Sequence, residues 1–587
     1  MIGDKRNFGD VFLKWQKHLK SAQDLTELLI NSIHLEHGTN KFYLVPFCDF
    51  DVLNDERIKL LAEWRQEYEF AFPSRFKVSL DGTKKWVKDQ VLLNENRVLF
   101  WVAKSNLEYL GHLGVVFKSE DEVLEIDNVL RGKKGYEGLM TACLQTLERE
   151  LEIEFSPEDI QLRVLESNSH AMNFYQNLGY AQVERTPLVK KATQERIDFI
   201  EGTPADDHFV LMRKSLFDVR PGSQRILTAG PTISNRETLY TYRATKSGWN
   251  EENSSSIIKF ENDFAQFVGS RFALVTSSCT GALHLSLLSL GIGPGDEVIV
   301  PDITWVATAS AVMYVGAKPI FAEIRKDDWT IDARSIKKLI TNKTKAIIPV
   351  HLYGYAAEMK EIQRIADENN LFVVEDAAPA IGTKIGEQKV GTFGDFGCYS
   401  FQGAKLLVTG EGGMLVTNDE ALYRKARKIQ DHGRKPGTFW IEELGHKYKM
   451  NNVTAALGLA QLERASNQIY RKRRINEWYR KNLGDLNQIS FQSESVDTRS
   501  ICWMTSIVLE DTEGISRDEL IRKLASEGID TRPVFPSISQ YPIWGYSPPV
   551  QETAQKVGEN GISLPGGVLL TKSQVDRVSE SVRRALT

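Results

Sequence analysis

The sequence predicts an α/β protein with at least two domains, and three observations lead to this prediction. The chain has 587 residues, which is several times the usual size of one domain. In its C-terminal part short apolar runs alternate with segments of helical length, and a stretch with Pro and Gly separates this part from the residues before it. The runs are Phe272–Val275, Glu297–Val300, Ala346–Val350 and Leu371–Val374. Runs that are apolar on both faces and separated by helices are typical of a mostly parallel sheet with helices on each side.

The boundary between the domains lies in Asp218–Ser223. This stretch contains Pro221 and Gly222, which interrupt helices and strands, and it follows the strand-like run His208–Met212. We predict an unassigned helical extension at 1–40, a first domain at 41–217, a linker at 218–224 and a second domain at 225–587. Within the second domain, a large domain extends to residue 450, and a long helix over 452–483 belongs to a smaller lobe at 451–587.

Composition excludes several classes of function. The formal net charge of −5 provides no basic surface for nucleic acid or for an anionic membrane. The five cysteines are scattered and form no CxxC pair, which argues against a zinc site or a disulfide framework. The sequence also lacks a signal peptide and an apolar run of about 18 residues. We therefore expect a soluble cytoplasmic protein that acts on small molecules without a metal.

Three segments place candidate cofactor-binding residues after these runs, where parallel sheets bind their ligands. Ser277–Gly281 follows the first run and opens a helix, so the free amides of Cys279 and Thr280 could hold a phosphate. An ordinary helix cap would have the same residues. Asp376 ends the fourth run, where its carboxylate could pair with a protonated pyridine nitrogen. Trp305 follows the second run and could cover the ring, although core packing would explain an aromatic residue there equally well.

A fourth segment contains Lys405, at the end of Tyr399-Ser400-Phe401-Gln402-Gly403-Ala404-Lys405 and shortly before Thr409–Gly413. Further blocks occur in order at Gly293–Val298, Val350–Gly354, Glu375–Ala378, Asp431–Gly433, Ala455–Gly458 with Gln461-Leu462, and Gly528–Pro533. Together the blocks resemble the DegT/DnrJ/StrS family of nucleotide-sugar aminotransferases, which depend on pyridoxal phosphate (PLP). The resemblance extends from about Arg225 to Thr587.

This resemblance implies an aspartate-aminotransferase-like large domain of PLP fold type I, with glutamate as the amino donor. It makes Lys405 the Schiff-base lysine and proton carrier, and Asp376 the partner of the pyridinium nitrogen. It further implies that the phosphate is held by Ser400 and the amides of Cys279 and Thr280, that Trp305 stacks on the ring, and that Arg532 and His351 contact the substrate. Relatives that dehydrate the sugar carry His where this chain has Lys405, so transamination is favoured.

Two positions depart from the family pattern. Pro379 stands where Gln is frequent, so a local substitute or water is expected for one usual cofactor hydrogen bond. Lys447 stands where many members place an Asn that reaches the phosphate of the neighbouring subunit, and a lysine could serve there as a point charge. That contact between subunits implies a homodimer with shared active sites.

The resemblance also suggests a substrate. Phe401–Gly413 and Pro436–Ile441 are most similar to aminotransferases that make dTDP-4-amino-4,6-dideoxyglucose, so we expect dTDP-4-keto-6-deoxyglucose as the substrate. GDP-linked substrates of the perosamine type are the alternative, because Thr531-Arg532-Pro533 is shared with the enzymes that use them.

The N-terminal part contains a glycine-rich loop, Val129–Met140, between a strand-like segment and an apolar helix. Lys134, Gly135 and Gly138 in this loop could hold a pyrophosphate, although a plain turn would also explain the glycines. Farther along the chain, Asn168–Tyr180 is similar to the second motif of the GNAT acyltransferases, and the two motifs occur in the order and spacing of that family. The resemblance covers about Phe42 to Leu216.

By this resemblance the loop binds acetyl-CoA, Asn168 contacts its pantetheine arm, and Tyr175 protonates the departing thiolate. Tyr175 could instead be a packing residue. Asp127 is our candidate for the base that deprotonates the attacking amine, and Glu125 and His112 are the alternatives. The two resemblances together predict a bifunctional enzyme of surface polysaccharide biosynthesis, which forms a 4-amino sugar and then acetylates it. The alternative is an aminotransferase with a non-catalytic GNAT-like module.

Overall fold

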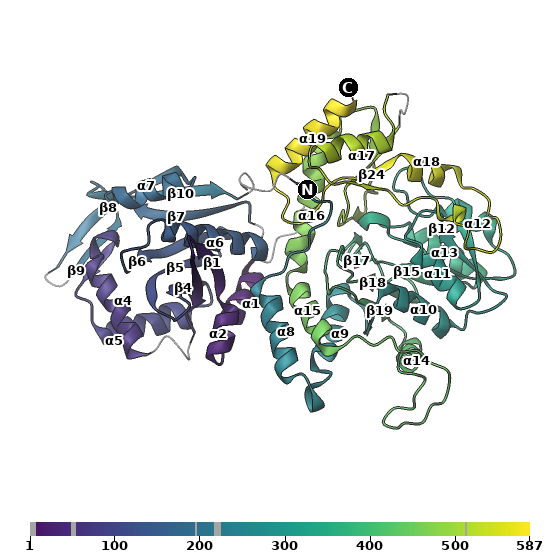
Figure 1. Cartoon of the computed structure of the whole chain (residues 1–587), viewed down its shortest axis with the longest axis horizontal. Coiled ribbons are helices and arrows are strands. Elements are labelled where there is room, and N and C mark those ends of the chain that lie inside the picture. Colours follow the sequence, from purple (N-terminus) through teal and green to yellow (C-terminus); the bar gives the residue numbers. More distant parts are fainter. Residues whose placement is uncertain are drawn as a thin grey trace. The chain divides into compact units, whose positions relative to one another are not determined.

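The chain forms two compact units in the computed structural model, which describes residues 8–48, 54–155, 157–193, 196–216, 225–510 and 514–586. The first unit comprises Met1–Val219 and Ile233–Leu239, and the second comprises Arg220–Thr232 and Tyr240–Thr587 (Figure 1). The predicted linker at 218–224 lies outside the described residues. Among the residues described, no helix is long and apolar enough to cross a membrane.

The first unit is built on a ten-stranded sheet in the order β1-β2-β4-β5-β6-β7-β10-β8-β9-β3. Its strands are β1 (Ile33–His37), β2 (Asn40–Pro46), β3 (Ser74–Phe76), β4 (Arg97–Lys104), β5 (Tyr109–Lys118), β6 (Val123–Arg131), β7 (Asp159–Leu165), β8 (Ala181–Ala192), β9 (Arg196–Glu201) and β10 (Asp207–Ser215). Its helices are α1 (Phe8–Lys20), α2 (Leu25–Asn31), α4 (Asp55–Glu67), α5 (Leu80–Val87), α6 (Leu139–Phe155) and α7 (Ser169–Asn177).

Strands β6 and β7 are parallel, whereas the other paired strands described in this sheet are antiparallel. In the described residues, β6 and β7 pair only at Glu125 with Gln161 and at Ile126 with Leu162, although both strands continue beyond these positions. Beyond the pairing, Asn128 adopts a left-handed backbone with φ of 50°, and the register between β5 and β6 shifts. Such a bulge redirects the strand and its side chains.

Helices cover both faces of this sheet, as the alternation along β4 shows. Phe100 packs with α1 and α6 on one face, whereas Trp101 packs with Trp64 of α4 on the other. Residues 8–40, which belong to the stretch that we predicted as an unassigned helical extension, are part of this structure. Phe12 and Trp15 of α1 are buried in the core, and β1 is a strand of the sheet. The amphipathic pattern of α1 predicts a helix with one apolar face, but it does not tell which sheet that face covers.

The second unit contains a seven-stranded sheet in the order β11-β19-β18-β15-β14-β12-β13. Its strands are β11 (Phe272–Thr276), β12 (Glu297–Pro301), β13 (Lys318–Ala322), β14 (Thr344–Ile347), β15 (Phe372–Asp376), β18 (Phe396–Ser400) and β19 (Gly413–Thr417). β19 is antiparallel to both of its neighbours, and the other pairs are parallel. The predicted mostly parallel sheet and its four apolar strands are therefore present.

Residues that alternate along the strands face two different cores. Leu274 packs with α10 and α14 on one face, whereas Ala273 and Val275 pack with α9 on the other. Figure 1 shows the helices on both sides of this sheet. They are α9 (Ser255–Val268), α10 (Cys279–Leu290), α11 (Ala307–Tyr314), α12 (Ala333–Leu339), α13 (Met359–Asn369) and α14 (Glu420–Gln430), while α8 (Asn235–Ser247) has residues in both units. This double cover explains why the strands are apolar on both faces.

A smaller lobe follows, with a four-stranded antiparallel sheet of β20 (Ile489–Phe491), β22 (Ser506–Leu509), β24 (Gly561–Ser563) and β23 (Arg532–Pro533). Its helices are α16 (Ala465–Leu483), α17 (Arg517–Ser526), α18 (Glu552–Asn560) and α19 (Lys572–Leu586), and β16 (Lys384–Ile385), β17 (Gln388–Lys389) and β21 (Thr498–Arg499) form a small separate sheet. The single long helix predicted over 452–483 is wrong. Helix α15 (Asn452–Glu463) ends before α16 at Arg464, whose fully buried guanidinium donates to the Thr232 carbonyl at 2.7 Å.

Candidate active sites

Lys405 lies in the loop after β18, and its side chain is half-buried. Its Nζ is 4.0 Å from the centre of the Trp503 ring, and the Trp503 indole donates to the Ala404 carbonyl at 2.9 Å. Burial lowers the pKa of Lys405, and interactions with Asp376 and Cys279 oppose part of this shift. A lowered pKa leaves more of the amine neutral, which is the form that attacks a carbonyl group.

Asp376 is the last residue of β15 and is buried. The Thr308 hydroxyl donates to Oδ2 at 2.7 Å, and the Ala378 amide donates to Oδ1 at 3.1 Å. Burial raises the pKa of the Asp376 carboxyl, whereas these two hydrogen bonds and the charge of Lys405 act in the opposite direction. The site thus holds a carboxylate at the carboxyl edge of the sheet, where a cationic partner would stabilise it.

The first turn of α10 provides backbone N–H groups at the same edge. Ser278 caps the helix, because its hydroxyl accepts from the Gly281 amide at 3.0 Å. The amides of Cys279 and Thr280 belong to the first turn and have no acceptor within the helix. Gly413 of β19 passes so close that a Cβ there would lie 2.6 Å from the Cys279 nitrogen. Burial raises the pKa of Cys279 well above its ordinary value, so this residue stays a neutral thiol.

Ser400 lies at the end of β18, next to the loop that contains Lys405, and is buried. Its hydroxyl accepts from the Gln402 amide at 3.3 Å. The structure therefore brings Lys405, Asp376 and Cys279 within electrostatic range of one another, with Ser400 on the strand that neighbours Asp376.

An aromatic row, made of Trp305, Phe535, Tyr353 and Trp503, leads to Lys405. Consecutive ring centres are 5.8, 5.4 and 6.1 Å apart. Trp305, at the far end of the row, is 61% exposed, so its ring remains available to cover a ligand. Sequence reasoning found Trp305 but missed the other three rings. It also missed Thr308, whose only signal was a hydroxyl in the first turn of α11, three residues after Trp305.

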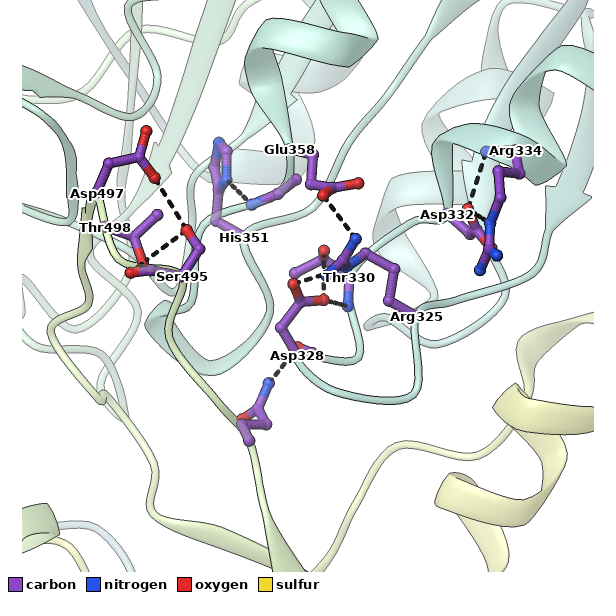
Figure 2. Close-up of polar contacts among 12 residues, drawn as sticks. Arg325, Asp328, Thr330, Asp332, Arg334, His351, Glu358, Ser495, Asp497 and Thr498 are labelled. Atoms are coloured by element: carbon purple, nitrogen blue, oxygen red, sulfur yellow. Dashed lines mark hydrogen bonds and ion pairs between the residues drawn. The ribbon is translucent and has the colours of Figure 1, made fainter.

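His351 does not fit its predicted role as a substrate contact. Its side chain has no exposed surface, its Nδ1 accepts from the Ala357 amide at 3.1 Å, and its Nε2 donates to Glu375 at 3.0 Å. Figure 2 shows His351 among loops of the second unit, near Arg325, which pairs with Asp328 and Glu358 at 3.0 and 2.6 Å. Both ring nitrogens are used to fix the loop, and none is left for a ligand.

Arg532 and Lys447 are exposed. Arg532 lies 3.4 Å from Asp530, and Lys447 lies 3.5 Å from Asp431. Asp431 also pairs with Lys449 at 2.9 Å and with Arg434 at 2.6 Å. Within the described part of the chain, neither Arg532 nor Lys447 forms a hydrogen bond or ion pair with Lys405 or Asp376. Their predicted ligand contacts remain predictions.

In the first unit, Tyr175 of α7 is buried, and its ring packs against Phe174 and Tyr180. Burial raises the pKa of Tyr175, and the charge of Asp127 raises it further, so the hydroxyl keeps its proton at neutral pH. Asp127 lies on β6, 3.0 Å from the Arg97 guanidinium. Its carboxylate accepts from the side-chain NH₂ group of Asn128 at 2.6 Å. The structure thus brings the predicted acid and base close enough to interact.

The other predicted residues of the first unit surround the ends of β6 and β7. Gly135 and Gly138 have φ of 113° and 73°, which favour glycine, and Lys134 is exposed in the same loop. Asn168 caps α7, with its side-chain oxygen accepting from the Ala171 amide at 3.2 Å. This leaves the amide N–H groups of Asn168 for another partner.

The two alternative bases have other contacts. Glu125 accepts from Gln161 at 3.1 Å and lies 3.5 Å from Lys118 and Arg163. His112 bonds through Nδ1 to the Asn128 carbonyl at 2.8 Å, and burial lowers its pKa to about 4. Asp127 is the residue whose charge acts on Tyr175, so it stays our candidate.

Lys405, Asp376 and the first turn of α10 thus lie at one edge of the sheet, and known proteins resemble this chain in sequence and fold. The model of the DegT/DnrJ/EryC1/StrS aminotransferase family matches residues 231–583. The chain belongs to this family. A GDP-perosamine synthase of Escherichia coli O157:H7 is 41% identical over 353 residues, which are 60% of this chain and 96% of that protein. A GDP-perosamine synthase of Vibrio cholerae is 36% identical over 358 residues, 60% of this chain and 97% of that protein.

Solved structures resemble the same part of the chain. Helicobacter pylori PseC, an aminotransferase involved in the biosynthesis of pseudoaminic acid, has 26% identity and a TM-score of 0.59, over 62% of this chain and 99% of that one. The PLP form of the sugar aminotransferase Spr1654 of Streptococcus pneumoniae has 25% identity and a TM-score of 0.58, over 62% of this chain and 100% of that one. The predicted PLP-dependent aminotransferase is therefore confirmed for the C-terminal part. These matches leave the predicted acetyltransferase as a prediction.

Proposed function

We propose that the second unit transfers an amino group from glutamate to C4 of a nucleotide-linked 4-keto-6-deoxy sugar, in the biosynthesis of a surface polysaccharide. The observation that carries this proposal is the Lys405 amine with its lowered pKa, close to the buried carboxylate of Asp376. The relatives named GDP-perosamine synthase favour a GDP-linked sugar over the dTDP-linked sugar that we expected.

The residues at this sheet edge fit PLP. Asp376 would hold the pyridine nitrogen, the amides of Cys279 and Thr280 and the Ser400 hydroxyl would hold the phosphate, and Trp305 would cover the ring. When bound, PLP supplies a ring that accepts electrons from the carbon next to the reacting nitrogen. Lys405 would carry the proton to and from that carbon, and its lowered pKa favours the neutral amine that can accept this proton. The aromatic row restricts water beside this amine.

A product assay tests the transamination. The full chain is incubated with PLP, glutamate and either GDP-4-keto-6-deoxymannose or dTDP-4-keto-6-deoxyglucose, and the amino sugar is detected by mass spectrometry. We expect the amine from the GDP-linked substrate, its loss in Lys405→Ala, and no change in Lys343→Ala, which removes an exposed lysine. An amine formed equally by Lys405→Ala would overturn the assignment.

For the first unit, the proposed reaction is transfer of an acetyl group from acetyl-CoA to the new amine. The sheet supports it, because β6 and β7 are parallel for two residue pairs only and then separate, close to Asp127, Asn168 and the loop through Gly135. Asp127 takes one proton from the ammonium group, the C–N bond forms as the thioester C–S bond breaks, and Tyr175 protonates the thiolate. The second proton that the nitrogen loses restores the Tyr175 hydroxyl. The alternative is a non-catalytic module, which would bind no CoA.

Acetyl transfer is tested by adding acetyl-CoA to the same reaction. We expect an amino sugar heavier by one acetyl group, and its loss in Tyr175→Phe while the free amine still accumulates. Because Phe keeps the packing against Phe174 and Tyr180, this variant separates loss of the hydroxyl from loss of the fold. Acetylation at the wild-type rate in Tyr175→Phe would contradict the assigned role.

The proposed homodimer with shared PLP sites is supported by an exposed apolar loop. The segment after α14 extends away from the rest of the second unit (Figure 1), and Phe439, Trp440 and Leu444 in this segment are 96, 71 and 91% exposed. Large apolar side chains gathered on one exposed loop mark an interaction surface. Lys447 lies at the base of this loop, as a cross-subunit phosphate contact would require.

A further inference from the structure

A second cavity lies within the first unit, and none of the predicted acetyl-CoA residues lines it. Its volume is ≈ 580 Å³, and it is bounded by α4, the segment from Phe72 to Ser79, α5, and residues of the strands β4, β5, β6 and β9. Asn128 of β6 forms part of its wall, so the cavity reaches the residue next to Asp127. A ligand there would have one end beside the proposed base.

The side chains around this cavity are cationic. Arg65, Lys77, Arg97 and Arg196 line it, and no Asp or Glu does so among the residues that the structure describes. Arg97 pairs with Asp127 at 3.0 Å and Arg196 with Asp198 at 2.6 Å. Arg65 and Lys77 form no ion pair within the described ranges. Two positive charges therefore remain without a carboxylate partner.

Arg65 is held in place but is not fully bonded. Its Nη2 donates to the Ser74 carbonyl at 2.6 Å, and its guanidinium carbon lies 3.4 Å from the centre of the Phe72 ring. Its Nη1 is buried and has no hydrogen-bond partner among the residues that the structure describes. Burial lowers the pKa of Arg65 to about 10, with the charge of Glu69 opposing the shift, so the group stays protonated at neutral pH. A buried charged donor without an acceptor is costly, and an anionic ligand would satisfy it.

The remaining lining suits a flat ring next to an anion. Phe76 is 40% exposed and Trp86 also lines the cavity, so both can stack on a nucleobase. Gly82 and Thr83, in the first turn of α5, add the positive end of a helix dipole. Guanidinium groups bind phosphates through paired hydrogen bonds. A nucleoside diphosphate combines both features, whereas a free amino sugar would bring only an ammonium group to a cationic cavity.

We infer that this cavity binds the nucleoside diphosphate of the acceptor, so that acetylation acts on the nucleotide-linked amino sugar and not on the free sugar. Arg65 and Lys77 hold the phosphates, Phe76 and Trp86 hold the base, and the sugar amine points toward Asn128 and Asp127. This inference rests on the proposed acetyl transfer for its meaning, but the binding itself can be measured without it.

Kinetics provide the first test. With the full chain, we expect efficient acetylation of the GDP-linked amino sugar, weak acetylation of the same sugar without nucleotide, and competitive inhibition by GDP. Arg65→Gln should raise the KM for the linked sugar about tenfold and leave the unlinked sugar unchanged. Lys59→Gln, which removes an exposed charge from the same helix, should behave as wild type. Equal use of linked and unlinked sugar would overturn the inference.

Calorimetric titration with GDP provides a test that needs no activity. We expect a class of GDP sites that is lost in Arg65→Gln, weakened in Lys77→Gln and kept in Lys59→Gln. Lys77 is exposed, so its substitution does not threaten the fold. If these GDP sites were found but no acetyl transfer occurred, the result would support nucleotide binding in the cavity and refute the proposed acetyltransferase activity. Identical GDP binding in all variants, or displacement of GDP from this class by CoA, would overturn the inference.

Discussion

At the scale of single residues, the charge of Asp376 depends on the Thr308 hydroxyl. Burial pushes the pKa of this carboxyl upward, and the hydrogen bond from Thr308 is the first of the interactions that lower it. The group must be ionised to pair with a pyridinium nitrogen. Removing the hydroxyl should therefore raise the pKa further and extend the pH range in which the pairing fails.

We predict that Thr308→Val lowers transamination and moves the acid limb of its pH profile toward higher pH. The expected shift is about half a unit to one unit, because one such hydrogen bond contributes about 1 kcal/mol. The measurement is kcat/KM against pH with the wild-type enzyme in parallel. Thr308→Ser keeps a hydroxyl and should restore the wild-type limb, whereas an unshifted limb in Thr308→Val would refute the role.

The sequence located Lys405 and Asp376 because each lies in a short contiguous motif next to a strand end. It could not locate Trp503 or Thr308, whose positions depend on how distant loops meet at the site. It also could not show that His351 is fully buried, since nothing in its own motif distinguishes a ring that faces a ligand from one that fixes a loop. Only the burial and both hydrogen bonds decide this.

At the scale of elements, Glu375 joins β15 to the loop before β18. Its Oε1 accepts from the amides of Phe393 and Gly394, both at 2.7 Å, and its Oε2 accepts from the Gly391 amide at 2.7 Å and from His351 at 3.0 Å. The side chain has no exposed surface. Because Asp376 follows directly, this anchor also fixes the end of the strand that carries the candidate cofactor partner.

Glu375→Gln should destabilise the second unit by about 2 to 4 kcal/mol, because its new NH₂ group would face donors where a carboxylate oxygen accepted. Differential scanning calorimetry of the full chain measures this as a lower transition temperature for that unit. Glu368→Gln is the matched control, since Glu368 is exposed on α13 and pairs with Arg364 on the same helix. Equal transitions in the two variants would show that the anchor is unimportant.

The strands of the second unit were predictable because both of their faces are buried, so their apolar runs needed no knowledge of the partner strands. The break between α15 and α16 was not predictable. The sequence of this region is compatible with one helix, and the residue at the break, Arg464, bonds to the Thr232 carbonyl, which lies more than two hundred residues away in the chain. In the first unit, likewise, β1 is identifiable only from its pairing with β2.

At the scale of the whole molecule, the exposed loop after α14 should hold two chains together. We predict that Trp440→Ser combined with Phe439→Ser converts the proposed dimer to a monomer, because both side chains lose apolar area that a partner would bury. Light scattering with size-exclusion chromatography measures the mass. Val496→Ser, which alters an exposed apolar residue elsewhere in the second unit, should stay dimeric. A double variant that remains a dimer would place the interface elsewhere.

The two proposed sites share no residue, since Lys405 and Asp376 belong to the second unit and Tyr175 and Asp127 to the first. We therefore predict that the activities can be removed one at a time. Lys405→Ala should slow amine formation by about a thousandfold or more. The same variant should acetylate a supplied GDP-linked 4-amino sugar at the wild-type rate. Tyr175→Phe should do the reverse and lose about a hundredfold in acetylation.

Mixing the two variants should restore the acetylated product, because the intermediate can leave one chain and enter another. If the mixture stayed inactive while each variant kept its own activity, the amine would have to pass between sites within one assembly, and free exchange of the intermediate would be wrong.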